Sequence, residues 1–225
     1  MVIPAYKEEG YIGKCLKALT QQTVKPHCVV VALYAPGGVR DATVVISQAY
    51  GARVVGVDRP GIGPARSIGV DATHAEAILN IDADSEPAPD FAERLLDALD
   101  HGDVAAFGFG NWREEEATLA ERAFVGLYSM FKELIPNGQC YGGLMVGREA
   151  YYAVGGFRDV PFEDTDLSFR LALAFPFRVR YVPEAFAYTS ARRLRGLLEK
   201  NPLAYVDYMK AYRKDGEETV PPGDS

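Results

Sequence analysis

The chain has 225 residues, 48% of them hydrophobic and 24% charged, which are ordinary values for a globular protein. This length suffices for one domain with a sizeable core. The net charge of -7 argues against a nucleic-acid-binding protein, which usually has a basic face, although a metal or local arginines still allow an anionic substrate.

Apolar runs alternate with helical patterns over the first hundred residues. Strands are predicted at 1–4, 27–33, 52–57 and 77–81. Helices are predicted around 12–19, at 41–50, from Pro64 and from about Pro89, and residues 86–89 are expected to stop any regular structure. This alternation predicts an α/β fold with a parallel sheet.

The second half has a similar pattern with longer helices. Strands are predicted at 104–109, 141–146 and 178–182, and helices at 114–135, 148–154, 164–174, 192–200 and 202–213. We find no internal repeat or linker, so residues 1–213 are predicted to form a single domain. The polar tail at 214–225 is predicted to be disordered.

The cysteines and the apolar runs indicate where the protein resides. The chain has three widely spaced cysteines without a Cys-X-X-Cys pair, which is typical of reduced thiols in an intracellular protein. The opening residues do not resemble a signal peptide, and no run of eighteen apolar residues could span a membrane. We expect a cytoplasmic protein with no transmembrane segment, and a peripheral contact with the cytoplasmic membrane face stays open.

Asp82 and Asp84 follow the apolar run at 77–81, with Ala83 between them. Because side chains alternate along an extended chain, both carboxylates can point the same way at the sheet edge where α/β proteins bind ligands. Two hard oxygen ligands suit Mg²⁺ or Mn²⁺ bound together with a diphosphate. The alternative is that they only end the strand and cap the next turn.

A second acidic cluster, formed by Glu163, Asp164 and Asp166, lies where a loop enters a helix. Carboxylates are common at such positions because the helix start stabilises them, so a capping role is one interpretation. The other is catalytic, since a carboxylate there could accept a proton from an acceptor hydroxyl.

Several segments, in order, resemble family 2 glycosyltransferases with the GT-A fold. They cover residues 1 to about 190 and are 2–9, 63–69, 80–84, 155–158 and 163–170. The resemblance implies a Rossmann-like, predominantly parallel mixed sheet flanked by helices, with a nucleotide-binding half at 1–100 and an acceptor half at 101–213. It also implies a hexosyltransferase that uses a nucleotide-diphosphate sugar and inverts the anomeric carbon.

The resemblance also assigns roles to individual residues. On the donor side, Asp84 would bind Mn²⁺ or Mg²⁺ in a DXD motif, Asp82 would contact the metal or the ribose, and Arg66 would lie near the nucleotide. The remaining nucleotide-sugar-binding residues would be Pro4, Ala5, Tyr6, Glu8, Ala83, Gly142 and Gly143.

On the acceptor side, Asp164 would be the catalytic base, and Glu163 would help to hold the acceptor. Asp166 would be structural, paired with the helix start.

The chain departs from the family pattern at several positions. Residues 32–36, at the end of the second strand, lack the usual carboxylates, so the nucleotide base stays open, with Tyr34 available for stacking. Lys7 stands where Asn is common, and no late histidine is available as a further metal ligand. All three histidines are predicted to be structural.

Other functions fit the sequence less well. The Gln-X-X-Arg-Trp signature of processive synthases is missing, which favours single-sugar transfer. An aspartyl-nucleophile phosphatase would need its Asp-X-Asp on the first strand, and the glycines at 61–63 are a weak dinucleotide signal. A non-catalytic GT-A protein that binds a nucleotide or a partner stays open, as does the acceptor: a glycan, a lipid-linked group, a lipid phosphate or a small molecule.

Overall fold

The computed structural model describes residues 1–36, 42–112, 143–190 and 192. The chain divides into two compact units, Met1–Thr189 and Ser190–Ser225, and the fold below is that of the first. Predictions for residues 113–142, 191 and 193–225, which include Gly142 and the helix at 114–135, lie outside the described residues.

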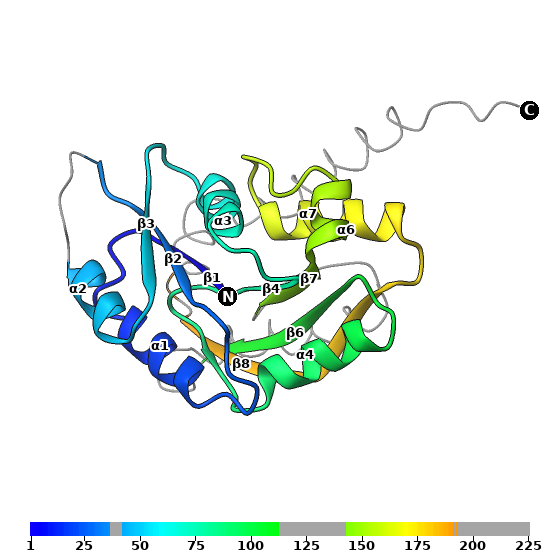
Figure 1. Ribbon diagram of the computed structural model, residues 1–225, viewed down its shortest axis with the longest axis horizontal. Helices are drawn as coiled ribbons and strands as arrows, with labels where there is room; N and C mark the ends of the chain where they lie inside the picture. Colours follow the sequence, from blue (N-terminus) through cyan, green and yellow to red (C-terminus); the bar gives the residue numbers. More distant parts are fainter. Residues whose placement is uncertain (37–41, 113–142, 191, 193–225) are drawn as a thin grey trace, which may run out of the picture. The chain divides into compact units, whose positions relative to one another are not determined.

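The described part of the first unit contains an eight-stranded mixed sheet with the order β3-β2-β1-β4-β7-β6-β8-β5 (Figure 1). The strands are β1 (Val2–Ala5), β2 (Val30–Tyr34), β3 (Arg53–Val57), β4 (Ala77–Asn80), β5 (Glu86–Pro87), β6 (Ala105–Trp112), β7 (Leu144–Gly147) and β8 (Val179–Thr189). β1 to β4 are mutually parallel where they pair, and β7 is antiparallel to both of its neighbours. The predicted α/β, GT-A-type fold with a predominantly parallel mixed sheet is confirmed.

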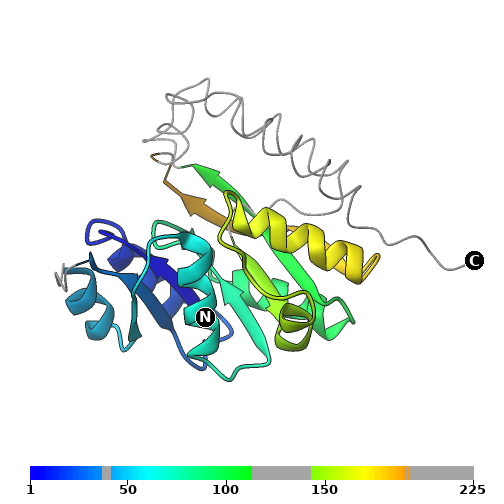
Figure 2. The same ribbon diagram turned by 90° about the horizontal axis from the view of Figure 1, so that it is seen from above.

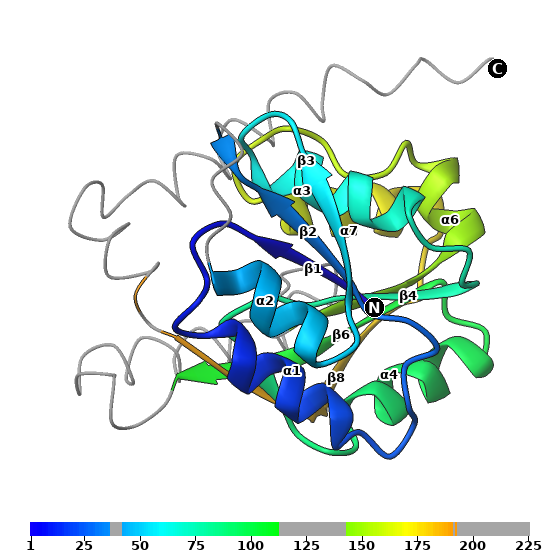
Figure 3. The same ribbon diagram turned by 60° about the vertical axis from the view of Figure 1, so that its left-hand side comes forward.

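Helices cover both faces of the sheet, as Figures 1 and 3 show. They are α1 (Ile12–Thr20), α2 (Ala42–Ala49), α3 (Ile62–Asp71), α4 (Phe91–Asp100), α6 (Arg148–Ala153) and α7 (Glu163–Ala174). On one face, α1 and α4 bury side chains such as Leu16 and Leu95 against Ile3. On the other face, α3, α6 and α7 bury residues such as Val70 and Leu171 in a second cluster. Figure 2 shows α3 and α7 from above.

Three sequence expectations about strands are corrected. Residues 86–89 do not lack regular structure, because Glu86–Pro87 forms β5, antiparallel to β8. β8 continues to Thr189, well past the predicted end at 182, because it pairs along β6 as well as with β5. Finally, Pro4 lies within β1 and does not stop it.

Close packing at Gly63 fixes the position of α3. A Cβ at Gly63 would lie 2.0 Å from the Arg158 carbonyl oxygen, a backbone atom. We therefore expect Gly63→Ala to destabilise the protein by about 1–3 kcal/mol, as overpacking typically does. Gly13→Ala, in the interior of α1, is the matched control, because its Cβ would meet Ile46 at an ordinary 3.6 Å. In urea denaturation, Gly13→Ala should leave the free energy of unfolding unchanged or raise it. Equal effects of the two variants would contradict the packing argument.

Candidate active site

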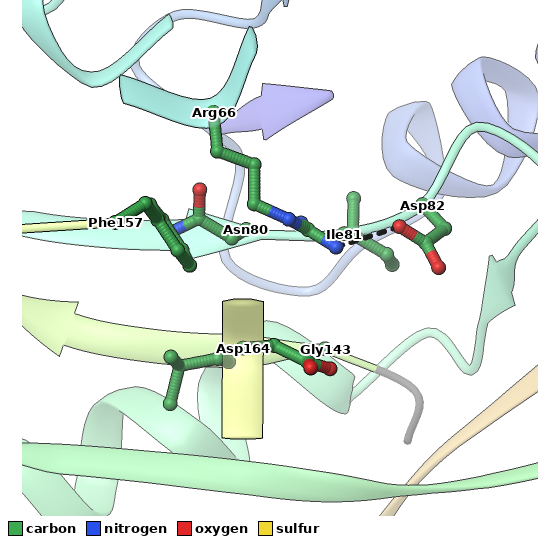
Figure 4. A pocket seen from close by; sticks show the side chains of 8 residues that line it. Arg66, Asn80, Ile81, Asp82, Gly143, Phe157 and Asp164 are labelled. Atoms are coloured by element: carbon green, nitrogen blue, oxygen red, sulfur yellow. Dashed lines mark hydrogen bonds and ion pairs between the residues drawn. The ribbon is translucent and has the colours of Figure 1, made fainter. Parts of the chain in front are cut away.

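A pocket that is partly open to solvent lies at the carboxyl end of β4 (Figure 4). Its lining comes from β4 and the turn after it, from α3, from the start of β7 and the residue before it, from the loop between α6 and α7, and from the start of α7. The lining residues are Arg66, Asn80, Ile81, Asp82, Gly143, Leu144, Phe157 and Asp164. The two acidic clusters singled out in the sequence thus contribute to one pocket, although about eighty residues separate them.

The Asp82–Asp84 segment forms a turn directly after β4. The strand ends at Asn80, and the amide of Ser85 donates a hydrogen bond to the Asp82 carbonyl at 3.1 Å. The Asp82 side chain is 32% exposed, whereas Asp84 is buried. Ala83 is fully buried in the core and does not line the pocket. Its side chain therefore does not support the predicted role of Ala83 in nucleotide-sugar binding.

Arg66 connects the two acidic clusters. Its Nη2 donates to Asp82 Oδ1 at 2.8 Å, and its Nε donates to Glu163 Oε1 at 2.9 Å. The guanidinium carbon lies 5.6 Å from the centre of the Phe157 ring. This buried cation ties α3 to the turn after β4 and to the first residue of α7.

The charge state of Arg66 follows from its neighbours. Burial lowers the pKa of Arg66, but the carboxylates of Asp82, Glu163 and Asp164 outweigh burial, and the net shift of the pKa is upward. Arg66 therefore stays charged in the buried site. The family resemblance predicts Arg66 near the nucleotide, and its pairing with both acidic clusters was not predicted.

Asp164 follows Glu163 on the first turn of α7 and lines the pocket. Burial raises the pKa of Asp164 to about 7 and repulsion from Glu163 adds to the rise, while Arg66 acts in the opposite direction. A carboxyl group that ionises near neutral pH suits general-base catalysis, because it is largely ionised at that pH and still binds a proton more strongly than an ordinary carboxylate.

Glu163 and Asp166 pair with arginine side chains and do not line the pocket. Glu163 is buried and accepts from Arg66, so the structure gives it a position next to the guanidinium rather than on the pocket wall. Asp166 accepts from Arg170 at 2.6 Å, and Arg170 also donates to the carbonyl groups of Val154 and Gly156. The Asp166–Arg170 pair thereby holds the glycine turn at 155–156 against α7.

The predicted base-and-ribose residues lie at the carboxyl ends of β1 and β2. Tyr6 is 46% exposed, and its ring centre lies 5.4 Å from that of Tyr34. The Lys7 ammonium lies 5.3 Å from the Tyr6 ring centre. Glu8, by contrast, is buried. Its backbone amide donates a hydrogen bond to Thr43 Oγ1 at 3.2 Å.

Pro4 and Ala5 are buried as part of β1. Of the predicted base-and-ribose residues, Tyr6 is therefore the one that presents a large exposed surface.

Gly143 lies in the pocket with a φ of +141°, a conformation that favours glycine. A Cβ there would lie 3.2 Å from the Asn80 carbonyl oxygen, so a larger residue at this position would crowd β4. Asn80 and Phe157 line the pocket and were not predicted as site residues. The signal for Asn80 was available, since it is a polar residue within an otherwise apolar run.

The side-chain oxygen atoms of Asp82 and Asp84 determine which metal ion the site would hold. Within the described ranges, no group of three or more His, Cys, Asp or Glu side chains is arranged to hold a metal ion. Burial raises the pKa of the Cys15 thiol, and negative charge on Asp84, Asp82 and Glu8 raises it further, which indicates a concentration of carboxylates here. Asp82 and Asp84 supply hard oxygen atoms, so they fit Mg²⁺ or Mn²⁺ when the remaining ligands come from a diphosphate and water.

Within the part of the chain that the structure describes, no helix is long and apolar enough to cross a membrane.

Comparisons with known proteins place these features in a family context. The model of the family described as "Glycosyl transferase family 2" matches residues 1–158. The comparison with curated protein sequences found no significant match.

Solved structures share the fold. Glucosyl-3-phosphoglycerate synthase from Mycobacterium tuberculosis, in complex with Mn²⁺, UDP and glucosyl-3-phosphoglycerate, superposes with a TM-score of 0.66 at 20% identity, over 87% of this chain and 73% of that one. The same enzyme with Mg²⁺ and UDP gives 0.65 at 21% identity, over 87% and 72%. TarS from S. aureus gives 0.63 at 18% identity, over 84% of this chain and 36% of that one.

Proposed function

Because the chain belongs to glycosyl transferase family 2 and is a glycosyltransferase, we propose that it transfers a single sugar from a nucleotide-diphosphate sugar to an acceptor, with inversion at the anomeric carbon. The acceptor atom would be a hydroxyl oxygen of a glycan, lipid-linked group or small molecule, or a lipid phosphate oxygen. We further propose a cytoplasmic enzyme, for which a peripheral membrane contact stays open.

One observation carries this proposal: Arg66 joins Asp82 to Glu163 beside a pocket that Asp82 and Asp164 both line. A transferase that activates an acceptor and releases a diphosphate needs a base and a cation-binding site within reach of one sugar. Asp164 would supply the base, and Asp82 would contribute to the cation-binding site.

On the donor side, Asp84 and Asp82 would hold Mn²⁺ or Mg²⁺. When bound, the metal supplies positive charge that stabilises the leaving diphosphate. The exposed Tyr6 ring, beside Tyr34, offers an aromatic surface for the nucleotide base. Glu163 would hold Arg66 in place, which modifies its expected role as a contact to the acceptor.

On the acceptor side, Asp164 would take the proton of the acceptor hydroxyl as its oxygen attacks the anomeric carbon. The bond between that carbon and the diphosphate oxygen breaks in the same displacement, and the nucleoside diphosphate leaves. One base with direct displacement inverts the anomeric centre.

Calorimetric binding tests the proposal. We expect either UDP or GDP, and one of its sugars, to bind in the presence of Mn²⁺ or Mg²⁺ and to lose binding in EDTA, because the carboxylates attract the diphosphate only through a cation. Asp84→Ala should abolish the metal-dependent binding.

The matched control is Asp97→Ala, which removes an exposed carboxylate on α4, outside the pocket lining. It should bind like the unmodified protein. Absence of binding to every nucleotide, with or without metal, would overturn the proposed function.

A further inference from the structure

Asn80 is the last residue of β4 and lines the pocket together with Arg66 and Asp164 (Figure 4). It is only 1% exposed. Both polar atoms of its side chain, Oδ1 and Nδ2, are buried, and no described residue forms a hydrogen bond with either.

A buried amide without hydrogen-bond partners is costly. Most buried polar groups in folded proteins are paired, and an unpaired one loses its hydration without compensation. The residues before Asn80 in β4 are apolar, and an apolar side chain would avoid that loss. The amide at this position is therefore available to a polar group that a ligand brings.

The strand geometry fixes the side to which Asn80 points. Ile78 packs into the cluster beneath α3, α6 and α7, and side chains two apart on a strand share a face. Asn80 consequently faces the layer that carries Arg66 and Asp164, the same layer that Asp82 contacts.

We propose that the Asn80 amide binds a hydroxyl group of the donor sugar and thereby contributes to the choice of sugar. This inference rests on the proposed function. In that reaction the sugar would lie between the diphosphate, near Asp82, and the attacking oxygen, near Asp164, and Asn80 lines the same pocket as these two carboxylates.

The chemistry of the amide favours a sugar hydroxyl over a phosphate oxygen. An amide offers one donor group and one acceptor atom, and a hydroxyl can both donate and accept. A phosphate oxygen only accepts, so it would leave Oδ1 of Asn80 unpaired.

Asn80→Leu tests the inference, since leucine keeps the branch at Cγ and removes both polar atoms. Binding of UDP, GDP, UDP-glucose, UDP-galactose, UDP-N-acetylglucosamine and GDP-mannose is measured with Mn²⁺. We expect the affinity for the preferred sugar nucleotide to fall roughly 10- to 100-fold, the loss expected when a buried hydroxyl loses its partner. The affinity for the free diphosphate should stay unchanged.

The melting temperature supplies an independent readout. Asn80→Leu should melt at a higher temperature than the unmodified protein without ligand, because the unpaired amide is gone. Ile78→Val is the matched control at a buried residue on the same face of β4, outside the pocket lining. It should lower the melting temperature and leave the ratio of sugar-nucleotide to diphosphate affinity unchanged.

Monodeoxy analogues of the preferred donor identify the hydroxyl. The unmodified protein should bind one analogue more weakly than the preferred donor, by a factor similar to the loss of affinity that Asn80→Leu causes. The Asn80→Leu variant should bind that analogue and the preferred donor with equal affinity.

Two results would overturn the inference alone: a parallel loss for the sugar nucleotide and the diphosphate, or no loss for either. If the unmodified protein binds no nucleoside diphosphate at all, the proposed function fails, and this inference fails with it.

Discussion

Asp164→Asn should lower the turnover of the sugar nucleotide by about 10² to 10⁴-fold, the range that general-base catalysis contributes. Asparagine keeps the shape of the side chain on the first turn of α7 but cannot accept the proton of the acceptor. Metal-dependent nucleotide binding should survive, because Asp82 and Asp84 are untouched. Release of nucleoside diphosphate in the presence and absence of acceptor is the measurement.

Asp166→Asn is the matched control on the same turn of α7. Asp166 pairs with Arg170 and does not line the pocket, so this change should lower stability and spare chemistry in the protein that remains folded. Full turnover in Asp164→Asn would exclude Asp164 as the base.

The pH dependence offers a second readout for the same residue. Because the pKa of Asp164 is raised to about 7, turnover should rise with pH through about 7 as the carboxylate forms. Between an ordinary Asp pKa near 4 and about 7, the unfolded chain has released this proton while the folded chain keeps it, so stability falls as pH rises. Asp164→Asn should therefore gain melting temperature over the unmodified protein at pH 8, and that gain should disappear at pH 4.

Arg66→Met should destabilise the protein by about 3–5 kcal/mol, the usual result of removing one partner from a buried ion pair. Methionine keeps much of the apolar stem of arginine. The loss of stability therefore reflects the removed charge and not a change in side-chain volume. The Glu163 side chain is only 8% exposed and would be left without its cation. Equilibrium denaturation in urea measures the change.

Two further variants separate the effect of the buried charge from the effect of removing any paired arginine. The double variant Arg66→Met with Glu163→Gln should recover part of the lost stability, because the carboxylate that needs compensation is gone. Arg94→Met removes an exposed partner of Asp90 and should cost less than about 1 kcal/mol. A loss no larger for Arg66→Met than for Arg94→Met would contradict the proposed role of Arg66 as the link between the two clusters.

Much of the fold could be predicted from local patterns. Apolar runs bounded by glycine and proline mark β1 to β4, and the helical spacing of Ile12, Leu16 and Leu19 marks α1. These signals are local because hydrophobic periodicity and turn residues act within a few positions of the chain. The placement of carboxylates just after β4 and at the start of α7 was visible for the same reason.

The pairing of distant strands could not be predicted in this way. Glu86 pairs with Tyr188, about a hundred residues away, and a two-residue strand has no periodicity of its own. Its existence depends on an edge supplied by β8. The extension of β8 to Thr189 likewise depends on pairing with β6 and β5. The end of β8 and the presence of β5 therefore could not be found from their own sequences.

The sequence by itself therefore determined the family, the order of most strands and helices, and the two acidic clusters, because these depend on short stretches of chain. Only the tertiary structure decided that Arg66 spans Asp82 and Glu163 and that the Asn80 amide is buried in the same pocket. Both facts depend on which distant groups share a small, poorly hydrated space. Burial and pairing are properties of all the neighbours together, and the fold alone assembles those neighbours.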